Sequence, residues 1–140
     1  MTDSDPTPAF EGRFQAQASS LREIRGAVHS TCEDLGVAEA CAHDVVLAVD
    51  EACQNIIRHA YSGESGEILV RIARKDADLV INLIDFAPEI DPASIRPRDL
   101  DDVKPGGLGT HLIAEIMDRV EFVDAPPDCG NMLLMVKRIE

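Results

Sequence analysis

The spacing of apolar residues predicts an amphipathic helix in the first third of the chain. Its apolar positions recur three or four residues apart, at Leu21, Ile24, Val28, Cys32 and Leu35. Ser20 and Glu23 have the S-x-x-E spacing of a capping box, in which each side chain bonds to the other residue's backbone amide. Gly36 then supplies a stop, so the pattern predicts one helix over residues 21–35.

A longer helix is predicted from about Ala38 to His59, with the stretch DEACQNIIRHAY at its end. At about 100° per residue, one face of this helix is made of Val45, Val49, Ala52 and Ile56. Glu51, Asn55 and His59 advance by about 40° each, so they follow a slanted line along one border of that face. This polar line is either a solvated helix edge or a row of ligands that points into a cleft beside the core.

Two patterns in the middle of the chain predict a β-hairpin. EILVRIAR (residues 67–74) alternates apolar and polar residues, whereas DLVINLID (residues 78–85) is a nearly continuous apolar run. The polar segment between them reads as a turn. We therefore expect a second strand that is largely buried and that ends at Asp85.

The remaining elements complete the order of strands and helices. A weak first strand is predicted within residues 8–17, and two closing strands at 120–123 and 131–139. A short helix is predicted over residues 110–120, directly after a glycine run. Because strands come in runs with helices grouped between them, we expect an α/β two-layer sandwich, with a mixed, mostly antiparallel sheet and helices on one face.

A long segment over residues 86–105 separates the hairpin from the short helix. It contains four prolines and several charges but little apolar periodicity. A loop of this length inside a compact domain is unusual and often serves as a lid. We expect residues 1–8 to be disordered and residues 9–140 to form a single domain that carries this lid.

The charge balance restricts the partners of the chain. Its 140 residues carry 13 basic and 26 acidic side chains, which gives a net charge of −13. We expect no direct nucleic-acid binding, because contact with a phosphate backbone needs clustered Lys and Arg. A ligand rich in phosphate would be repelled unless backbone amides and a metal cation held it.

The sequence also indicates the compartment. No apolar run approaches the roughly 20 residues needed to span a bilayer. The acidic N-terminus lacks the basic-then-apolar order of a secretory signal. The four cysteines have no metal-ligand spacing, so free thiols are expected. We expect a cytoplasmic protein that makes no membrane contact.

Three features have the chemistry to bind one nucleotide. Asn55 offers a carbonyl oxygen suited to magnesium, and Glu51, one turn earlier, could accept a proton from an attacking hydroxyl. Asp85, at a buried strand end, could accept a hydrogen bond from the amino group of adenine. The Gly106–Gly109 run precedes a helix whose first amides could hold phosphates. Each feature alone also has an ordinary interpretation, as a solvated edge, a turn former or permissive backbone.

These motifs resemble those of a known family. E-A-x-x-N-x-x-x-H-A-Y at residues 51–61 looks like the N-box of bacterial anti-sigma factor serine-protein kinases, which belong to the ATPase superfamily of DNA gyrase and sensor histidine kinases. DFAPEIDP at residues 85–92 is similar to the adenine-reading box, although Ala87 stands where the family usually has glycine. GGLGTHLIAEIMDRV at residues 106–120 resembles the second glycine box.

The resemblance implies a two-layer sandwich that binds ATP and Mg²⁺ under a mobile lid. It implies a serine/threonine protein kinase that acts as an anti-sigma factor and phosphorylates an anti-sigma factor antagonist in a partner-switching system. A sigma factor or other regulator would be a second partner, and a homodimer is expected.

The resemblance also implies roles for individual residues. Glu51 would be the catalytic base, Asn55 the magnesium ligand and Asp85 the adenine partner. Nucleotide contacts are implied at Asn55, His59, Asp85, Ala87, Gly106, Gly107, Leu108, Gly109 and Thr110. In the lid, Arg96, Arg98 or Lys104 could touch the γ-phosphate, and the spacing does not select among them.

Other interpretations stay open. A non-catalytic ATP-binding partner switch would keep the fold and lose the transfer; Ala87 favours that alternative, whereas Glu51 favours a kinase. A histidine-kinase catalytic module ranks below both, because the chain has no dimerisation helix pair with a phosphoacceptor histidine. The fold could also be retained without nucleotide binding. For His59, capping the helix or supporting the site is the alternative to a direct role.

Overall fold

Strand pairing in the described residues produces one five-stranded sheet. The computed structural model describes residues 7–61, 64–87 and 106–139, with the backbone alone at 106–110. The strands are β1 (Phe10–Gln15), β2 (Glu67–Lys75), β3 (Asp78–Asp85), β4 (Arg119–Val123) and β5 (Asn131–Arg138). They lie in the order β1-β2-β3-β5-β4, and each neighbouring pair is antiparallel. The predicted hairpin is therefore confirmed as β2–β3.

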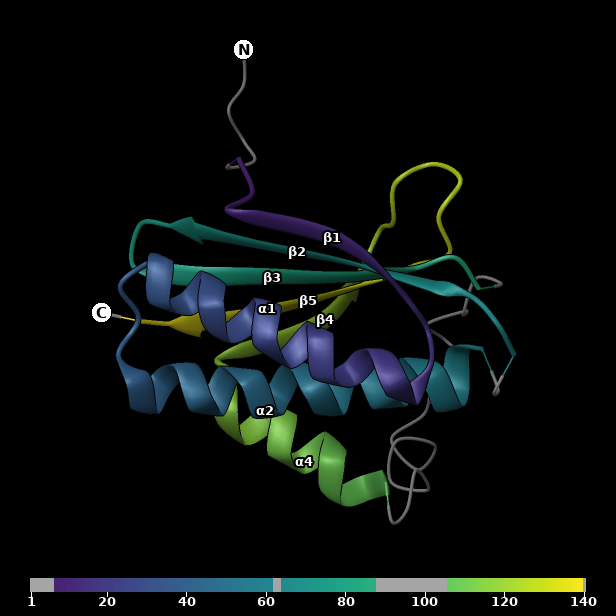
Figure 1. Cartoon of the computed structure of the whole chain (residues 1–140), viewed down its shortest axis with the longest axis horizontal. Helices are drawn as coiled ribbons and strands as arrows, with labels where there is room; N and C mark the ends of the chain where they lie inside the picture. The colour runs from purple at the N-terminus through teal and green to yellow at the C-terminus, as the bar shows by residue number, and fades with distance from the viewer. Residues whose placement is uncertain (1–6, 62–63, 88–105, 140) are drawn as a thin grey trace.

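The helices lie together on one side of this sheet (Figure 1). They are α1 (Leu21–Asp34), α2 (Glu39–Asn55) and α4 (Gly106–Ile116). A short 3₁₀ turn, η1 (Ala18–Ser20), leads into α1, and a π-helical turn, η2 (Ile56–Ala60), continues α2. The two-layer sandwich predicted from the sequence is confirmed. None of the helices in the described part of the chain is both long and apolar enough to cross a membrane.

An aliphatic core fills the space between the layers. The sheet contributes alternate residues of its central strands, all almost fully buried: Ile68, Val70, Ile72, Ile81, Leu83 and Met135. The helices contribute the positions that the helical spacing predicts, among them Ile24, Val28, Val45, Val49 and Ala52. The apolar residues that recur with the helical period of 3.6 and those that recur with the strand period of 2 therefore lie in the same core. In each kind of element the period identifies the face that is removed from water.

The outer face of the sheet points away from the helices. Alternation along the strands puts Arg71, Val80, Asn82, Leu134 and Val136 on this face. They line a shallow groove of about 680 Å³. These five residues form the outer face of the sheet.

The start of α1 differs from the prediction. Ser20 has a helical backbone (φ −82°, ψ −17°) and makes no side-chain capping hydrogen bond, so the capping box does not form. The reason is local, since η1 precedes the helix and a capping side chain needs an extended backbone at its own residue. The predicted stop at Gly36 is confirmed by its φ of +78°, which glycine adopts without strain.

The glycine run also differs from the prediction. We expected Gly106–Gly109 to precede the helix, but α4 begins at Gly106 and ends at Ile116, so the run forms the start of the helix itself. The predictions of disorder at the N-terminus and of a lid lie largely outside the described residues, at 1–6 and 88–105.

Candidate functional site

Glu51 and Asn55 lie one turn apart at the C-terminal end of α2. Ala52 and Cys53 beside them are buried against the core, which fixes the rotation of this turn. The Glu51 side chain keeps 21% of its surface exposed, and Asn55 is also half-buried. Both predicted side chains therefore lie at the border between core and solvent, as the helical spacing requires.

Arg58 connects the two. Its Nη2 donates a hydrogen bond to Asn55 Oδ1 at 2.9 Å, and the same nitrogen lies 3.8 Å from Glu51 Oε2. We did not predict this contact. Its signal is present in the sequence, because a residue three positions after Asn55 and two turns after Glu51 projects from the same side of the helix.

His59 lies in the π-helical turn η2 and is exposed. Its pKa is lowered, chiefly by partial burial and secondarily by the positive charge of Arg58. Among the described residues, His59 makes no hydrogen bond to Glu51 or Asn55. Its contact with a nucleotide therefore stays a prediction.

Asp85, at the end of β3, is 3% exposed. Its Oδ1 accepts hydrogen bonds from Asn131 Nδ2 at 2.9 Å and from the backbone N–H of Ala87 at 3.1 Å. Burial raises the pKa of Asp85, and the hydrogen bonds from Asn131 and Ala87 offset only part of that effect. The sequence did not reveal Asn131, which faces Asp85 across the β3–β5 pair.

Ala87 replaces the family's usual glycine without backbone strain. Among the described non-glycine residues, only Asp76 and Asp128 have a positive φ, so Ala87 does not need the freedom of glycine. It is buried and belongs to the core cluster. The close approach that requires glycine lies opposite, at Gly130, where a Cβ would fall 2.0 Å from the Ala87 carbonyl oxygen.

Tyr61 ties the end of α2 to the segment that carries Asp85. Its hydroxyl donates to the Glu67 carbonyl at 2.6 Å and accepts from the Phe86 backbone N–H at 2.7 Å. A second N–H, from Glu67, approaches the same oxygen at 3.3 Å. The residue after η2, the start of β2 and the segment after β3 are thus held together around the Tyr61 hydroxyl. Sequence reasoning noted Tyr61 only as the last letter of the N-box.

The glycine run is the third predicted part of the site. Because α4 starts at Gly106, the first amides of the helix belong to the run. Such amides have no acceptor within the helix and carry its positive dipole end. The helix is anchored to the core by Ile113 and by Met117 directly after its end, both of which are buried. The predicted contacts at Leu108 and Thr110 concern side chains outside the described part.

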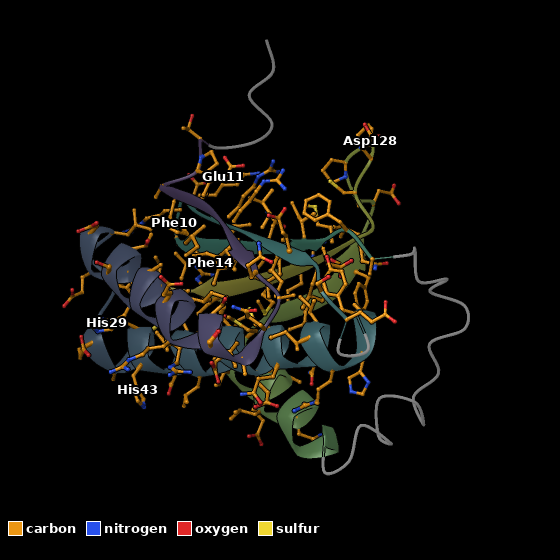
Figure 2. All side chains as sticks on the ribbon, turned by 45° about the vertical axis from the view of Figure 1, so that its right-hand side comes forward. Phe10, Glu11, Phe14, His29, His43 and Asp128 are labelled. Carbon is orange, nitrogen blue, oxygen red and sulfur yellow. The ribbon has the colours of Figure 1, made fainter. Side chains whose placement is uncertain are left out.

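The donor set fits a magnesium ion. Mg²⁺ prefers oxygen ligands and takes few from the protein when substrate phosphates supply others. Asn55 Oδ1 is such an oxygen, and its hydrogen bond to Arg58 shows that it already faces a cationic group. His29 and His43 take no part, since Figure 2 shows both at the other end of the helical layer from the end of α2.

Comparisons with known proteins agree with this fold. A family model described as the histidine kinase-like ATPase domain matches residues 14–137. The chain is 29% identical over 139 residues to the serine-protein kinase RsbW of Bacillus cereus (strain G9842), covering 94% of this chain and 85% of the relative. The RsbW protein of Bacillus thuringiensis (strain Al Hakam) is 28% identical over the same shares.

Two solved structures share the fold. One contains the RsbU and RsbW domains of Rv1364c from Mycobacterium tuberculosis, with a TM-score of 0.66, 16% identity and 96% of this chain covered. This chain spans only 32% of that longer protein. The other is the SiaB–SiaC complex from Pseudomonas aeruginosa, with a TM-score of 0.56, 18% identity and 89% of this chain covered. At these identities the likeness concerns the fold alone.

Proposed function

The chain belongs to the histidine kinase-like ATPase domain family, and on that premise we propose that it is an ATP-dependent protein serine/threonine kinase and anti-sigma factor. Its substrate would be an anti-sigma factor antagonist in a partner-switching system. The match to serine-protein kinases named RsbW over 94% of the chain supports the kinase activity. The observation that carries the proposal is Glu51 beside Asn55 at the end of α2, tied through Tyr61 to the segment with Asp85.

Asp85 would recognise the adenine base. Its buried carboxylate is oriented by Asn131 and Ala87, and in the ionised form it can only accept hydrogen bonds. Adenine presents an amino group, a donor, where guanine presents a carbonyl oxygen, an acceptor. An acceptor at this position therefore favours ATP over GTP.

The phosphate end would use backbone amides and a metal ion. The first amides of α4, at Gly106 and the residues after it, would bind phosphate oxygens. Asn55 would hold Mg²⁺, which neutralises phosphate charge when it is bound. These two means of holding phosphate are compatible with a chain of net charge −13.

Glu51 would be the catalytic base. It would accept the proton of a substrate serine or threonine hydroxyl as that oxygen forms a bond to the γ-phosphorus. The bond between the γ-phosphorus and its bridging oxygen then breaks, and ADP leaves with both electrons of that bond. The border position of Glu51, whose side chain is 21% exposed, leaves it accessible to a hydroxyl that a partner protein brings.

Two partners and a second copy complete the proposal. The antagonist would be the phosphorylation substrate, and a sigma factor or another regulator would be the protein held and released. The outer face supports a homodimer, because apolar Val80 and Leu134 lie there beside the Glu11–Arg71 ion pair of 3.1 Å. The activity would take place in the cytoplasm, because its ATP and sigma factor are there.

Phosphoryl transfer to a co-purified partner tests the function. The protein is incubated with γ-labelled ATP, Mg²⁺ and the antagonist captured from the source cell, and the phosphosite is mapped. We expect Glu51→Ala to abolish transfer while ATP affinity, measured by calorimetry, stays within about threefold of the wild type. Transfer that persists in this variant would show that Glu51 is not the base. Nucleotide-dependent binding without any transfer would favour the non-catalytic partner switch instead.

A further inference from the structure

We propose that Arg58 is a positioning residue that competes with Mg²⁺ for Asn55, and that its release uncovers Glu51. The proposal rests on the function proposed above and concerns how the same site changes when nucleotide binds. Neither the motifs nor the comparisons assign a role to Arg58.

The contacts of Arg58 carry the inference. A single guanidinium donates to Asn55 Oδ1 at 2.9 Å and lies 3.8 Å from Glu51 Oε2. Its other terminal nitrogen reaches Gln54 Oε1 at 3.5 Å. The proposed metal ligand and the proposed base are therefore held by the same cation.

The surroundings keep Arg58 in this position without burying it. Gln54 is itself held by Asp50, whose Oδ2 accepts from Gln54 Nε2 at 2.8 Å. Asp50 Oδ1 in turn accepts from Arg25 of α1 at 2.9 Å. The Arg58 side chain is 46% exposed, so it can leave its partners without opening the core.

Competition follows from the charges. A guanidinium and a magnesium ion bound to the same carboxamide oxygen would repel each other at close range. Mg²⁺ at Asn55 therefore requires Arg58 to move, and each bound state excludes the other. The movement also takes the guanidinium away from Glu51, so binding of the metal and exposure of the base occur together.

Arginine at position 58 therefore has two effects on the site that an apolar residue would not have. Its contacts stabilise Asn55 and Glu51, because these two polar groups at the border of the core have a partner. It also raises the Mg²⁺ concentration at which nucleotide binds tightly. The Mg²⁺ dependence of ATP binding is therefore the property that Arg58 sets.

The test compares Arg58→Met with Arg119→Met. Arg58→Met removes the positive charge that contacts Asn55 and Glu51. Arg119→Met removes an equal charge from an exposed ion pair with Glu121 within β4. ATP affinity is measured by calorimetry in EDTA and at a series of Mg²⁺ concentrations. We expect half of the Mg²⁺-dependent gain in affinity at about a fivefold lower Mg²⁺ concentration in Arg58→Met, which corresponds to about 1 kcal/mol. Arg119→Met should match the wild type.

Each outcome decides the matter. An unchanged or higher Mg²⁺ requirement in Arg58→Met, with ATP still bound, overturns the Arg58 proposal and leaves the proposed function intact. Wild-type protein that binds no ATP with or without Mg²⁺ overturns the proposed function and this inference with it. Arg58→Lys, which keeps the charge but not the paired donors of the guanidinium, should fall between wild type and Arg58→Met. Circular dichroism confirms that each variant is folded.

Discussion

The hydroxyl of Tyr61 accepts a hydrogen bond from the backbone N–H of Phe86 at 2.7 Å and donates one to the Glu67 carbonyl at 2.6 Å. This one side chain joins the end of the N-box helix, the start of β2 and the segment after β3. Phe86 directly follows Asp85, so the position of the proposed adenine partner depends on Tyr61.

Tyr61→Phe tests this dependence. The substitution keeps the buried ring but leaves the Phe86 N–H and the Glu67 carbonyl without their partner, which costs about 1–3 kcal/mol of folding free energy. We expect that loss in urea unfolding, together with weaker ATP binding in calorimetry. A variant with lowered stability and unchanged ATP affinity would show that Tyr61 supports the fold without positioning Asp85.

Gly130→Ala tests the contact opposite Ala87. A Cβ at Gly130 would lie 2.0 Å from the Ala87 carbonyl oxygen, so the backbone must shift. Overpacking of this kind costs about 1–3 kcal/mol, and here it should also displace Asp85, whose carbonyl accepts from the Gly130 N–H at 2.8 Å. We expect lower stability and weaker ATP binding, measured by urea unfolding and calorimetry.

Gly26→Ala is the matched control for that variant. Gly26 lies within α1, and a Cβ there meets nothing within 4 Å. Alanine in a helix interior is favoured over glycine by about 0.5–1 kcal/mol, so this variant should be more stable with unchanged ATP affinity. If Gly130→Ala behaves like Gly26→Ala, the Ala87 carbonyl does not restrict the side chain at position 130.

Asp85→Asn separates adenine recognition from stability. Burial raises the pKa of Asp85, so holding its carboxylate in the ionised form costs folding free energy. The amide should therefore leave the free energy of unfolding unchanged or higher, while ATP affinity falls by at least about tenfold because a charge-assisted hydrogen bond is lost. Asp78→Asn, at the other end of β3, is the control and should leave ATP affinity unchanged. Equal ATP affinities of Asp85→Asn and the wild type would show that Asp85 does not bind the nucleotide.

The sequence predicted those helices and strands whose buried residues recur at one regular spacing. The run at residues 78–85 is β3 as expected, and the pattern of α2 identified Val45, Val49 and Ala52 as core residues. The same pattern placed Glu51 and Asn55 at the border of that face, where the structure has them. Periodicity reports which side of an element is removed from water, and these positions depend on little else.

Contacts between distant segments could not be predicted in this way. The Tyr61–Phe86 bond and the Asn131–Asp85 bond each depend on two strands or turns meeting in a particular register. The capping box at Ser20 failed for a related reason, since a preceding 3₁₀ turn changed the backbone that the motif requires. Arg58 was missed although its spacing was visible, because a charge on an exposed helix turn is usually solvated.

The pH dependence of stability should reveal the contact between α1 and α2 at the end remote from the site. His29 Nε2 of α1 lies 3.0 Å from Glu39 Oε2 of α2, and this hydrogen bond, followed by the charge of Glu39, raises the pKa of His29 above 6.5. A raised folded-state pKa means that the stabilisation is fully present below the unfolded pKa and is lost as the pH rises through the folded pKa.

We therefore expect His29→Gln to lower the free energy of unfolding at pH about 5.5 and to have little effect at pH about 8.5, measured in urea. A gap between wild type and His29→Gln that does not shrink with rising pH would show that the His29–Glu39 pair contributes no charge-dependent stability.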